Sequence, residues 1–315
     1  MTADLNNPIF TDEEAARAHY EAIRWPNGPV CPHCGAIDSA TQLHGKSTRP
    51  GVYKCRECEK PFSATVGTVF ERSHIPLNKW LLAMHLLCSS KKGMSAHQLH
   101  RMLGVTYKTA WFMAHRIREA MNDGGSSGPL GGKNKIVEAD ETYIGPSRAI
   151  FINGKGWQRE QGISSKLKVV TLVERGGRAR SLKVDQLTAK NVRQFVVANA
   201  SRESRLMTDE ARYYPRLGLE FASHESVNHA KKEYARGDVT TNTVEGYFSI
   251  FKRGMKGVYQ HCSEKHLQRY LHEFDFRYSN RIALGVDDAT RATLAAKGAE
   301  GKRLTYRQPR QRAHG

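Results

Sequence analysis

Four of the six cysteines stand in two close pairs that have the spacing of metal ligands. Two residues separate Cys31 from Cys34, two separate Cys55 from Cys58, and twenty residues lie between the pairs. Thiolates at this spacing are typical of a tetrahedral zinc site, in which two turns each supply two sulfur ligands. Because four sulfurs complete the coordination shell, we expect a structural zinc ion rather than a catalytic one.

Three acidic residues form a second candidate group. Asp140 follows the apolar run "KIVEA", Asp209 follows "RLMT", and Glu245 comes after a gap of 35 further residues. Either aspartate alone is usual for a turn or a helix cap. Three carboxylates that meet repel each other, and one or two divalent cations such as Mg²⁺ relieve the repulsion. Two such ions can also stabilise the attacking and leaving oxygens of phosphodiester displacement.

The third acid lies in the stretch "NTVEGYFSIFKR", residues 242–253. Its apolar residues recur at spacings of three and four, which predicts an amphipathic helix. Glu245 and Lys252 are seven residues apart, so they lie two turns apart at the edge of the apolar face. They are either a solvated pair at the rim of the helix or part of a site.

The charge balance of the chain favours a polyanionic partner. The 315 residues include 49 Lys and Arg against 31 Asp and Glu, a formal net charge of +18. A surplus this large is typical of nucleic-acid binding. No apolar run is long enough to predict a membrane span, and the N-terminus lacks the pattern of a secretory signal. The paired cysteines then indicate a metal in a reducing compartment.

Three helices are predicted between residues 75 and 121, with a tight turn at Gly104 before the last one. This outline is typical of a helix-turn-helix, although a three-helix packing unit with a basic outer face would give the same pattern. In the first interpretation the last helix reads DNA. Its candidate DNA-binding residues are Thr106, Tyr107, Lys108 and Arg116.

The order of the elements predicts the domain organisation. The stretch "NDGGSSGPLGGKNK" has the composition of a linker, and strands and helices alternate after it, which favours the α/β class. The predicted segments are an N-terminal helix (1–26), a zinc ribbon (27–74), a helix-turn-helix module (75–121), a Gly/Ser linker (122–134), an α/β domain (135–284) and a basic flexible tail (285–315).

Taken together, the chain resembles small bacterial insertion-sequence transposases of the DDE type, the ISXO-like group, which have an N-terminal zinc ribbon. The resemblance covers most of residues 20 to 282. One departure follows "YIG", where the family commonly has a Gly/Lys-rich basic segment and this chain has "PSRAIFINGKGWQRE". The matching stretches are "CPHC…CREC", "FSATVGTVFERSHIPLNKW", "VEADETYIG", "NTVEGYFSIFKRGMKGVY" and "HLQRYLHEFDFRYSNR".

The resemblance implies an RNase H-like catalytic core and assigns roles to residues within it. Asp140, Asp209 and Glu245 would hold two Mg²⁺ or Mn²⁺ ions. Lys252 would contact a DNA phosphate near the cleaved bond. Asn242 and His229 are second-tier candidates for the site, and a surface-loop histidine is an equally good interpretation of His229.

The resemblance also implies a function. The protein would bind the terminal inverted repeats of an insertion sequence, cut the DNA and join the freed ends to target DNA. Two DNA ends must be held together, so a homodimer or higher oligomer is expected, at the nucleoid in the bacterial cytoplasm. Two alternatives stay open: a non-enzymatic zinc-ribbon regulator, and a structure-specific nuclease on the same fold.

Overall fold

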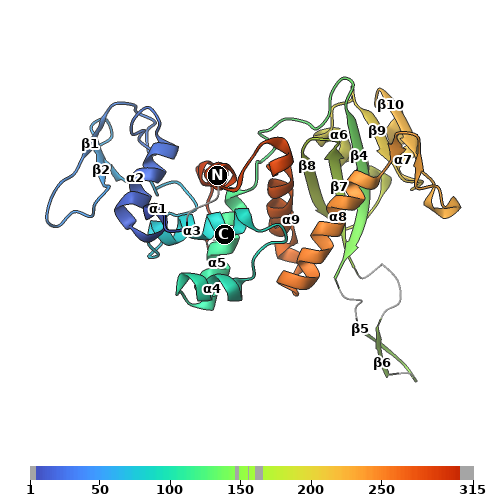
Figure 1. Ribbon diagram of the computed structural model, residues 1–315, viewed down its shortest axis with the longest axis horizontal. Helices are drawn as coiled ribbons and strands as arrows, with labels where there is room; N and C mark the ends of the chain where they lie inside the picture. Colours follow the sequence, from blue (N-terminus) through green and yellow to red (C-terminus); the bar gives the residue numbers. More distant parts are fainter. Residues whose placement is uncertain (1–4, 146–148, 155, 160–165, 306–315) are drawn as a thin grey trace, which may run out of the picture. The chain divides into compact units, whose positions relative to one another are not determined.

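The computed structural model describes residues 5–145, 149–154, 156–159 and 166–305. The chain divides into two compact units (Figure 1). The first contains Met1–Ser90, Met94–Asn122 and Val286–Gly315, and the second contains Lys91–Gly93 and Asp123–Gly285. None of the helices in the described ranges is long and apolar enough to cross a membrane.

The first unit begins with two helices, α1 (Pro8–Thr11) and α2 (Glu13–Arg24), followed by a small antiparallel sheet. The sheet has the order β1 (Ala40–Gln42), β2 (Tyr53–Cys55) and β3 (Pro61–Phe62). Trp25 packs edge-on against the rings of Tyr53 and Phe62, with centroid distances of 5.6 and 5.7 Å. This aromatic cluster is the apolar core of a segment that has few other large side chains.

Three further helices follow in the first unit: α3 (Leu77–Ser89), α4 (Ala96–Leu103) and α5 (Tyr107–Ala120). Ser95 caps the start of α4, and Gly104 ends it in the left-handed conformation at a φ of 60°. Thr106 then caps α5. The predicted turn at Gly104 is therefore present, and its glycine is required because a β-branched or bulky residue is strained at positive φ.

The C-terminal segment of the first unit is helical. Helix α10 (Asp288–Lys297) packs on α3, and its Arg291 donates a 2.8 Å hydrogen bond to the carbonyl oxygen of Cys88. The prediction of a flexible tail from residue 285 is wrong for this segment. Its alanines have high helix propensity and small side chains that allow close packing, a combination that the Ala/Gly-rich composition concealed. Residues 306–315 lie outside the described ranges.

The second unit is built on a mixed five-stranded sheet with the order β10-β9-β4-β7-β8 (Figure 1). Strands β4, β7 and β8 form an antiparallel meander, whereas β9 and β10 add to the other side of β4 in parallel. The strands are β4 (Ile136–Ile144), β7 (Leu167–Glu174), β8 (Ala179–Val184), β9 (Arg205–Thr208) and β10 (Ser223–Ser226).

Helices cover both faces of this sheet (Figure 1). Val170 and Leu172 of β7 face α6 (Ala189–Asn199) and α7 (Tyr214–Gly218). Val169 and Val173 face α8 (Asn242–Gly254) and α9 (Glu264–Ser279). The period-two alternation of the strand thus supplies two apolar cores, and the predicted α/β class is confirmed.

The segment predicted as a Gly/Ser linker is packed rather than free. Leu130 is fully buried in the core beneath α6, and its backbone N–H donates a 2.8 Å hydrogen bond to the carbonyl oxygen of Asn199. Arg178 also holds this stretch, because it donates hydrogen bonds to the carbonyl oxygens of Ser127 and Pro129 at 2.6 and 2.9 Å.

Short elements complete the second unit. A hairpin, β5 (Ala149–Ile152) and β6 (Gly156–Arg159), lies within the stretch that departs from the family pattern. A second small hairpin, β11 (Ala235–Arg236) and β12 (Val239–Thr240), precedes α8, and a π-helical turn (Met255–Tyr259) follows it.

Candidate active site and metal centres

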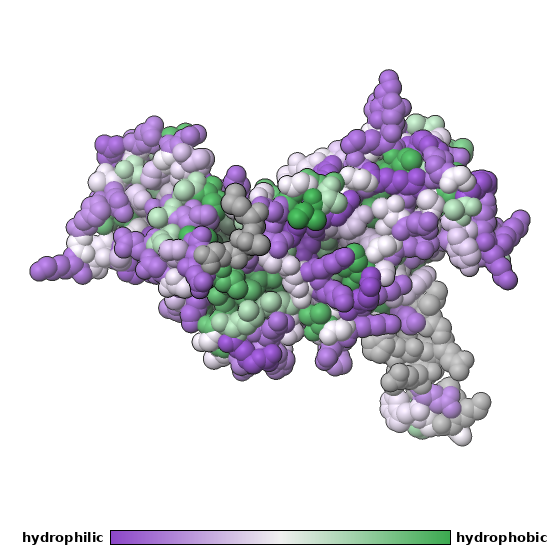
Figure 2. Space-filling model, viewed as in Figure 1, coloured by the Kyte–Doolittle hydropathy of each residue, from purple (hydrophilic) through white to green (hydrophobic). Residues whose placement is uncertain are grey.

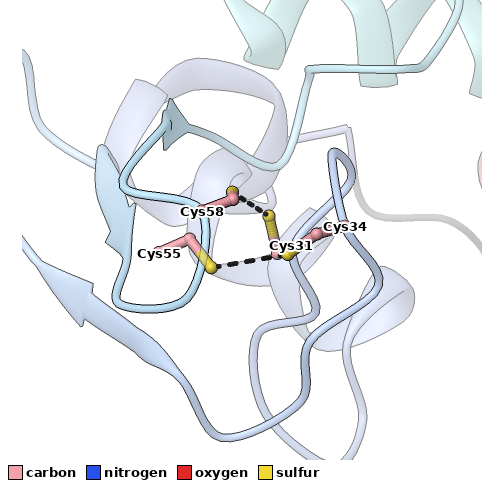
Figure 3. A group of neighbouring side chains, drawn as sticks. All are labelled: Cys31, Cys34, Cys55 and Cys58. Carbon is pink, nitrogen blue, oxygen red and sulfur yellow. Dashed lines mark hydrogen bonds between the residues drawn. The ribbon is translucent and has the colours of Figure 1, made fainter.

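The four paired cysteines meet in the first unit (Figure 3). Their sulfur atoms all lie within 4.8 Å of one another. The Sγ atoms of Cys31 and Cys58 are 3.7 Å apart, as are those of Cys34 and Cys55. Four sulfurs about 2.3 Å from a tetrahedral zinc ion would be separated by about 3.8 Å, so the cluster fits zinc without rearrangement.

Local backbone geometry forms this cluster. Cys31 donates its N–H to the carbonyl oxygen of Ala36 and accepts one from Gly35 on its own carbonyl, which closes a tight turn. Gly35 adopts a φ of 77°, which favours glycine. Cys55 ends β2 and Cys58 follows after a short turn. Both turns are encoded within a few residues, which is why the spacing predicted the site.

In the second unit, the sheet brings Asp140 and Asp209 together. Asp140 lies on β4 and Asp209 directly follows β9, the parallel neighbour of β4. Glu138 pairs with Met207 at the end of the parallel register, and Asp140 and Asp209 each lie two residues further along, so both come to the same end of this strand pair. Carboxylate oxygens of Asp140, Glu141 and Asp209 lie within 4.8 Å of one another. This is the donor set that hard divalent cations prefer.

Glu141 was not assigned a role from the sequence, yet its carboxylate belongs to this group. Glu141 accepts hydrogen bonds from the hydroxyl groups of Tyr213 and Tyr214, at 3.0 and 2.7 Å. Consecutive strand residues point to opposite faces, so Glu141 is held on the α7 side while Asp140 points to the α8 side. The sequence signal was present, because two acids follow one apolar run.

The electrostatics of the group favour a bound cation. The pKa of Asp140 is raised to about 8, mostly by burial and in part by the negative charges of Asp209, Glu141 and Glu245. Burial also raises the pKa of Asp209 and of Glu141. Without a cation these carboxyl groups therefore retain protons more readily than free ones, and a divalent ion would displace those protons and stabilise the ionised forms.

Glu245 lies beside this group, in the first turn of α8. Its side chain is 46% exposed and is outside the 4.8 Å cluster, but its charge acts on Asp140. Thr241 donates a 3.1 Å hydrogen bond to Oε1 of Glu245, and Nε2 of His229 lies 3.5 Å from the same oxygen. The structure thus brings His229 to the acids.

Asn242 and Lys252 lie on the exposed side of α8. Asn242 is the first residue of the helix, and the Nζ atom of Lys252 lies 5.9 Å from the ring centroid of Phe248. On the face drawn in Figure 2, hydrophilic residues predominate over α8. Lys252 is two helical turns beyond Glu245 and open to solvent, where it can meet an anion.

The residues proposed to contact DNA from α5 differ in their environments. Lys108 is exposed, and Tyr107 is 43% exposed with its ring stacked on His97 at 4.3 Å. The Thr106 hydroxyl accepts a hydrogen bond from the N–H of Thr109, so it serves as the helix cap.

The prediction that Arg116 contacts DNA has to be corrected. Its side chain is only 6% exposed, it donates a 2.6 Å hydrogen bond to the carbonyl oxygen of Glu71, and its guanidinium lies 5.4 Å from the ring centroid of Trp80. The group is used inside the first unit and is not available to DNA. The basic residue at mid-helix looked like a surface charge because its partners lie 36 and 45 residues away in sequence.

Two family models and one curated relative match this chain. Residues 129–279 match the ISXO2-like transposase domain, and residues 11–61 match the transposase zinc-ribbon domain. An uncharacterised protein in transposable element ISH50 of Halobacterium salinarum is 29% identical over 282 residues, covering 85% of this chain and 91% of that protein.

Solved structures give a weak likeness. The crystal structure of the Mos1 strand transfer complex matches with 13% identity and a TM-score of 0.27, covering 71% of this chain and 79% of that one. A pre-cleavage Mos1 transpososome matches with 12% identity and a TM-score of 0.28, covering 70% and 79%.

The family matches bear on the two metal centres. The zinc-ribbon match and the four clustered cysteines support a structural zinc ion, and the transposase domain with its acidic group implies a divalent cation. The predicted α/β transposase domain behind a zinc ribbon is confirmed, whereas the helix-turn-helix assignment stays a prediction. Residues 129–279 thus form an ISXO2-like transposase domain and residues 11–61 a transposase zinc ribbon, the two parts that the resemblance to insertion-sequence transposases predicted.

Proposed function

We propose that the protein binds the terminal inverted repeats of an insertion sequence and catalyses metal-dependent strand cleavage and strand transfer. The observation that carries this proposal is that the carboxylates of Asp140 and Asp209 lie close together at the ends of two parallel strands. Burial and mutual repulsion make the ionised forms of these carboxylates unfavourable unless a cation is bound. A regulator that only binds DNA would not need such a group.

Asp140, Asp209 and Glu245 would hold Mg²⁺ or Mn²⁺, with two ions as the working arrangement. Divalent ions at this site would supply charge stabilisation for the attacking and leaving oxygens of a phosphodiester. The chain contributes the geometry: two carboxylates fixed by the sheet and a third from the first turn of α8.

The proposed reaction has two displacements. In cleavage, the oxygen of water attacks phosphorus at the transposon end, the bond to the 3′ oxygen breaks, and a 3′-hydroxyl and a 5′-phosphate result. In strand transfer, that 3′-hydroxyl attacks a phosphorus atom of target DNA, and the target's own 3′ oxygen leaves. One phosphodiester forms as one breaks, so no external energy source is needed.

Other residues would position the DNA. Lys252 would contact a phosphate next to the cleaved bond, since it is exposed on the same side of α8 as Glu245. His229, 3.5 Å from Glu245, and Asn242 would orient groups at the edge of the site. The Lys108 ammonium and the exposed Tyr107 ring would contact the terminal repeat from the start of α5, together with the zinc ribbon.

The protein would act as a homodimer or larger assembly, because two transposon ends have to be joined to one target. The decisive experiment incubates the purified protein and Mg²⁺ with DNA carrying the repeats that flank its own locus. We expect a nick at the repeat boundary, which is lost with a scrambled repeat or with Asp140→Asn. Cleavage that ignores the repeat sequence would favour a structure-specific nuclease, and no cleavage would contradict the proposal.

A further inference from the structure

A second buried carboxylate lies two residues from Asp140 on the same strand. Glu138 of β4 is fully buried, and strand alternation points it to the same face as Asp140, the face that α8 covers. It lies outside the acidic group described above. Burying a carboxylate costs free energy unless its oxygens accept hydrogen bonds. The donors that contact Glu138 therefore indicate what it stabilises.

Glu138 caps the helix that carries Glu245. Its carboxylate accepts hydrogen bonds from the backbone N–H groups of Thr243 and Val244, at 2.8 and 2.9 Å, and from the Thr243 hydroxyl at 2.8 Å. The N-cap residue of α8, Thr241, makes no side-chain capping bond of its own. The cap therefore comes from another strand, and it also places a negative charge at the positive end of the helix dipole.

Arg175 pairs with Glu138 and also contacts two other segments near the acidic group. This residue directly follows β7, and its Nε donates a 2.6 Å hydrogen bond to Oε1 of Glu138. Its Nη2 lies 3.1 Å from the sulfur of Met207, two residues before Asp209, and donates a 2.9 Å hydrogen bond to the carbonyl oxygen of Thr240, just before α8. One guanidinium thus touches all three segments that bear the acids.

We propose that Glu138 and Arg175 form a positioning pair that sets the place of Glu245 relative to Asp140 and Asp209. The inference rests on the proposed divalent-cation site. Glu245 lies in the first helical turn, where a helix frays first, and its side chain is partly exposed, so packing alone holds it weakly. Anchoring that turn to β4 fixes the third carboxylate against the strand that carries the first.

The test measures metal binding as well as cleavage. Mn²⁺ binding to the full-length, zinc-loaded protein is followed by the electron paramagnetic resonance signal of the free ion. We expect Glu138→Gln, which keeps volume but removes charge, to weaken Mn²⁺ binding by about tenfold or more, as supporting residues of metal sites do. Raising the Mn²⁺ concentration should restore part of the cleavage rate, which a misfolded fraction would not allow.

Glu273→Gln is the matched control. Glu273 is also fully buried and paired with an arginine, Arg277, but it lies on α9. It should lower the melting temperature as any broken buried pair does, and leave Mn²⁺ affinity unchanged. If Glu138→Gln does not fold, Thr243→Val, which removes only the hydroxyl donor, carries the test, with a smaller weakening of Mn²⁺ binding expected.

The outcomes distinguish failure of the proposed cation site from failure of the proposed positioning pair. If wild type binds Mn²⁺ no better than Glu245→Gln, the cation site is wrong and the positioning pair falls with it. If wild type binds Mn²⁺ and the folded Glu138→Gln or Thr243→Val variant binds it equally well, the pair is merely structural and the cation site stands.

Discussion

The hydroxyl group of Tyr214 donates a 2.7 Å hydrogen bond to Oε2 of Glu141, the residue that follows the first aspartate of the acidic group. Tyr214 is fully buried, and this bond lowers the pKa of Glu141 against the larger effect of burial. The contact therefore connects α7 to β4 at the residue next to Asp140.

Tyr214→Phe should therefore destabilise the second unit. It leaves a buried acceptor without its donor, which costs about 1–3 kcal/mol in the free energy of unfolding, and it raises the pKa of Glu141 further. Urea denaturation checks the magnitude. Tyr213→Phe is the comparison, because Tyr213 makes the same kind of bond from a half-buried position and should cost less. Equal, negligible losses would mean that the contact does not stabilise this region.

The zinc site predicts about one zinc ion per chain by elemental analysis. Cys55→Ser should abolish stoichiometric zinc and unfold residues 27–74, since the metal supplies much of the folding free energy of so small a segment. Cys262→Ser, outside the cluster, should keep the full zinc content. A folded wild-type preparation without zinc would refute the assignment.

Glu245→Gln should lower cleavage by at least about a hundredfold, because losing a ligand should cost no less than losing a residue that supports one. The melting temperature and DNA affinity should change little, as the side chain is half exposed and its contact with His229 is worth at most about 1 kcal/mol. Glu264→Gln is the control, an exposed acid in the first turn of α9. Full activity in Glu245→Gln would show that α8 does not supply a catalytic metal ligand.

Lys252→Ala should slow cleavage by weakening DNA positioning, with Mn²⁺ affinity unchanged, because we propose that the ammonium contacts a phosphate rather than the cation. Single-turnover nicking and Mn²⁺ titration are measured on the same samples. Lys190→Ala removes the same charge from an exposed position on α6, on the opposite face of the sheet, and should have little effect. Equal cleavage in both variants would show that Lys252 is only a surface charge.

Two basic residues of α5 should behave in opposite ways. Lys108→Ala should leave the melting temperature unchanged and reduce the salt dependence of DNA binding by about one unit of slope, as expected for a lost phosphate contact. Arg116→Met should lower the melting temperature, because the guanidinium bonds to Glu71 and stacks on Trp80. If Lys108→Ala binds DNA with an unchanged salt slope, α5 does not read the repeat.

Local signals made part of this structure predictable. The cysteine cluster depends on two short turns, and the ends of two apolar runs indicated Asp140 and Asp209. The parallel pairing of β4 with β9 then places the two acids together, and the resemblance to DDE transposases had implied the same arrangement.

Contacts between distant residues were not predictable in this way. Glu138 looks like an ordinary acid within a strand until Arg175 and the start of α8, 105 residues away, supply its partners. Arg116 and Leu130 were misassigned for the same reason: each sits in a stretch whose composition suggests exposure, and each is buried by residues far along the chain.

The packing of α10 on α3 has a consequence for biosynthesis. These helices are separated by about two hundred residues of sequence, and the whole second unit is made between them. A ribosome therefore releases the sheet and its acidic group before the last helix of the first unit exists. Because domains generally fold as units during translation, the second unit can fold before the last helix of the first unit has been synthesised. Premature termination near residue 285 would leave α3 without its cover, exposing apolar surface on a truncated chain that still carries every proposed catalytic residue.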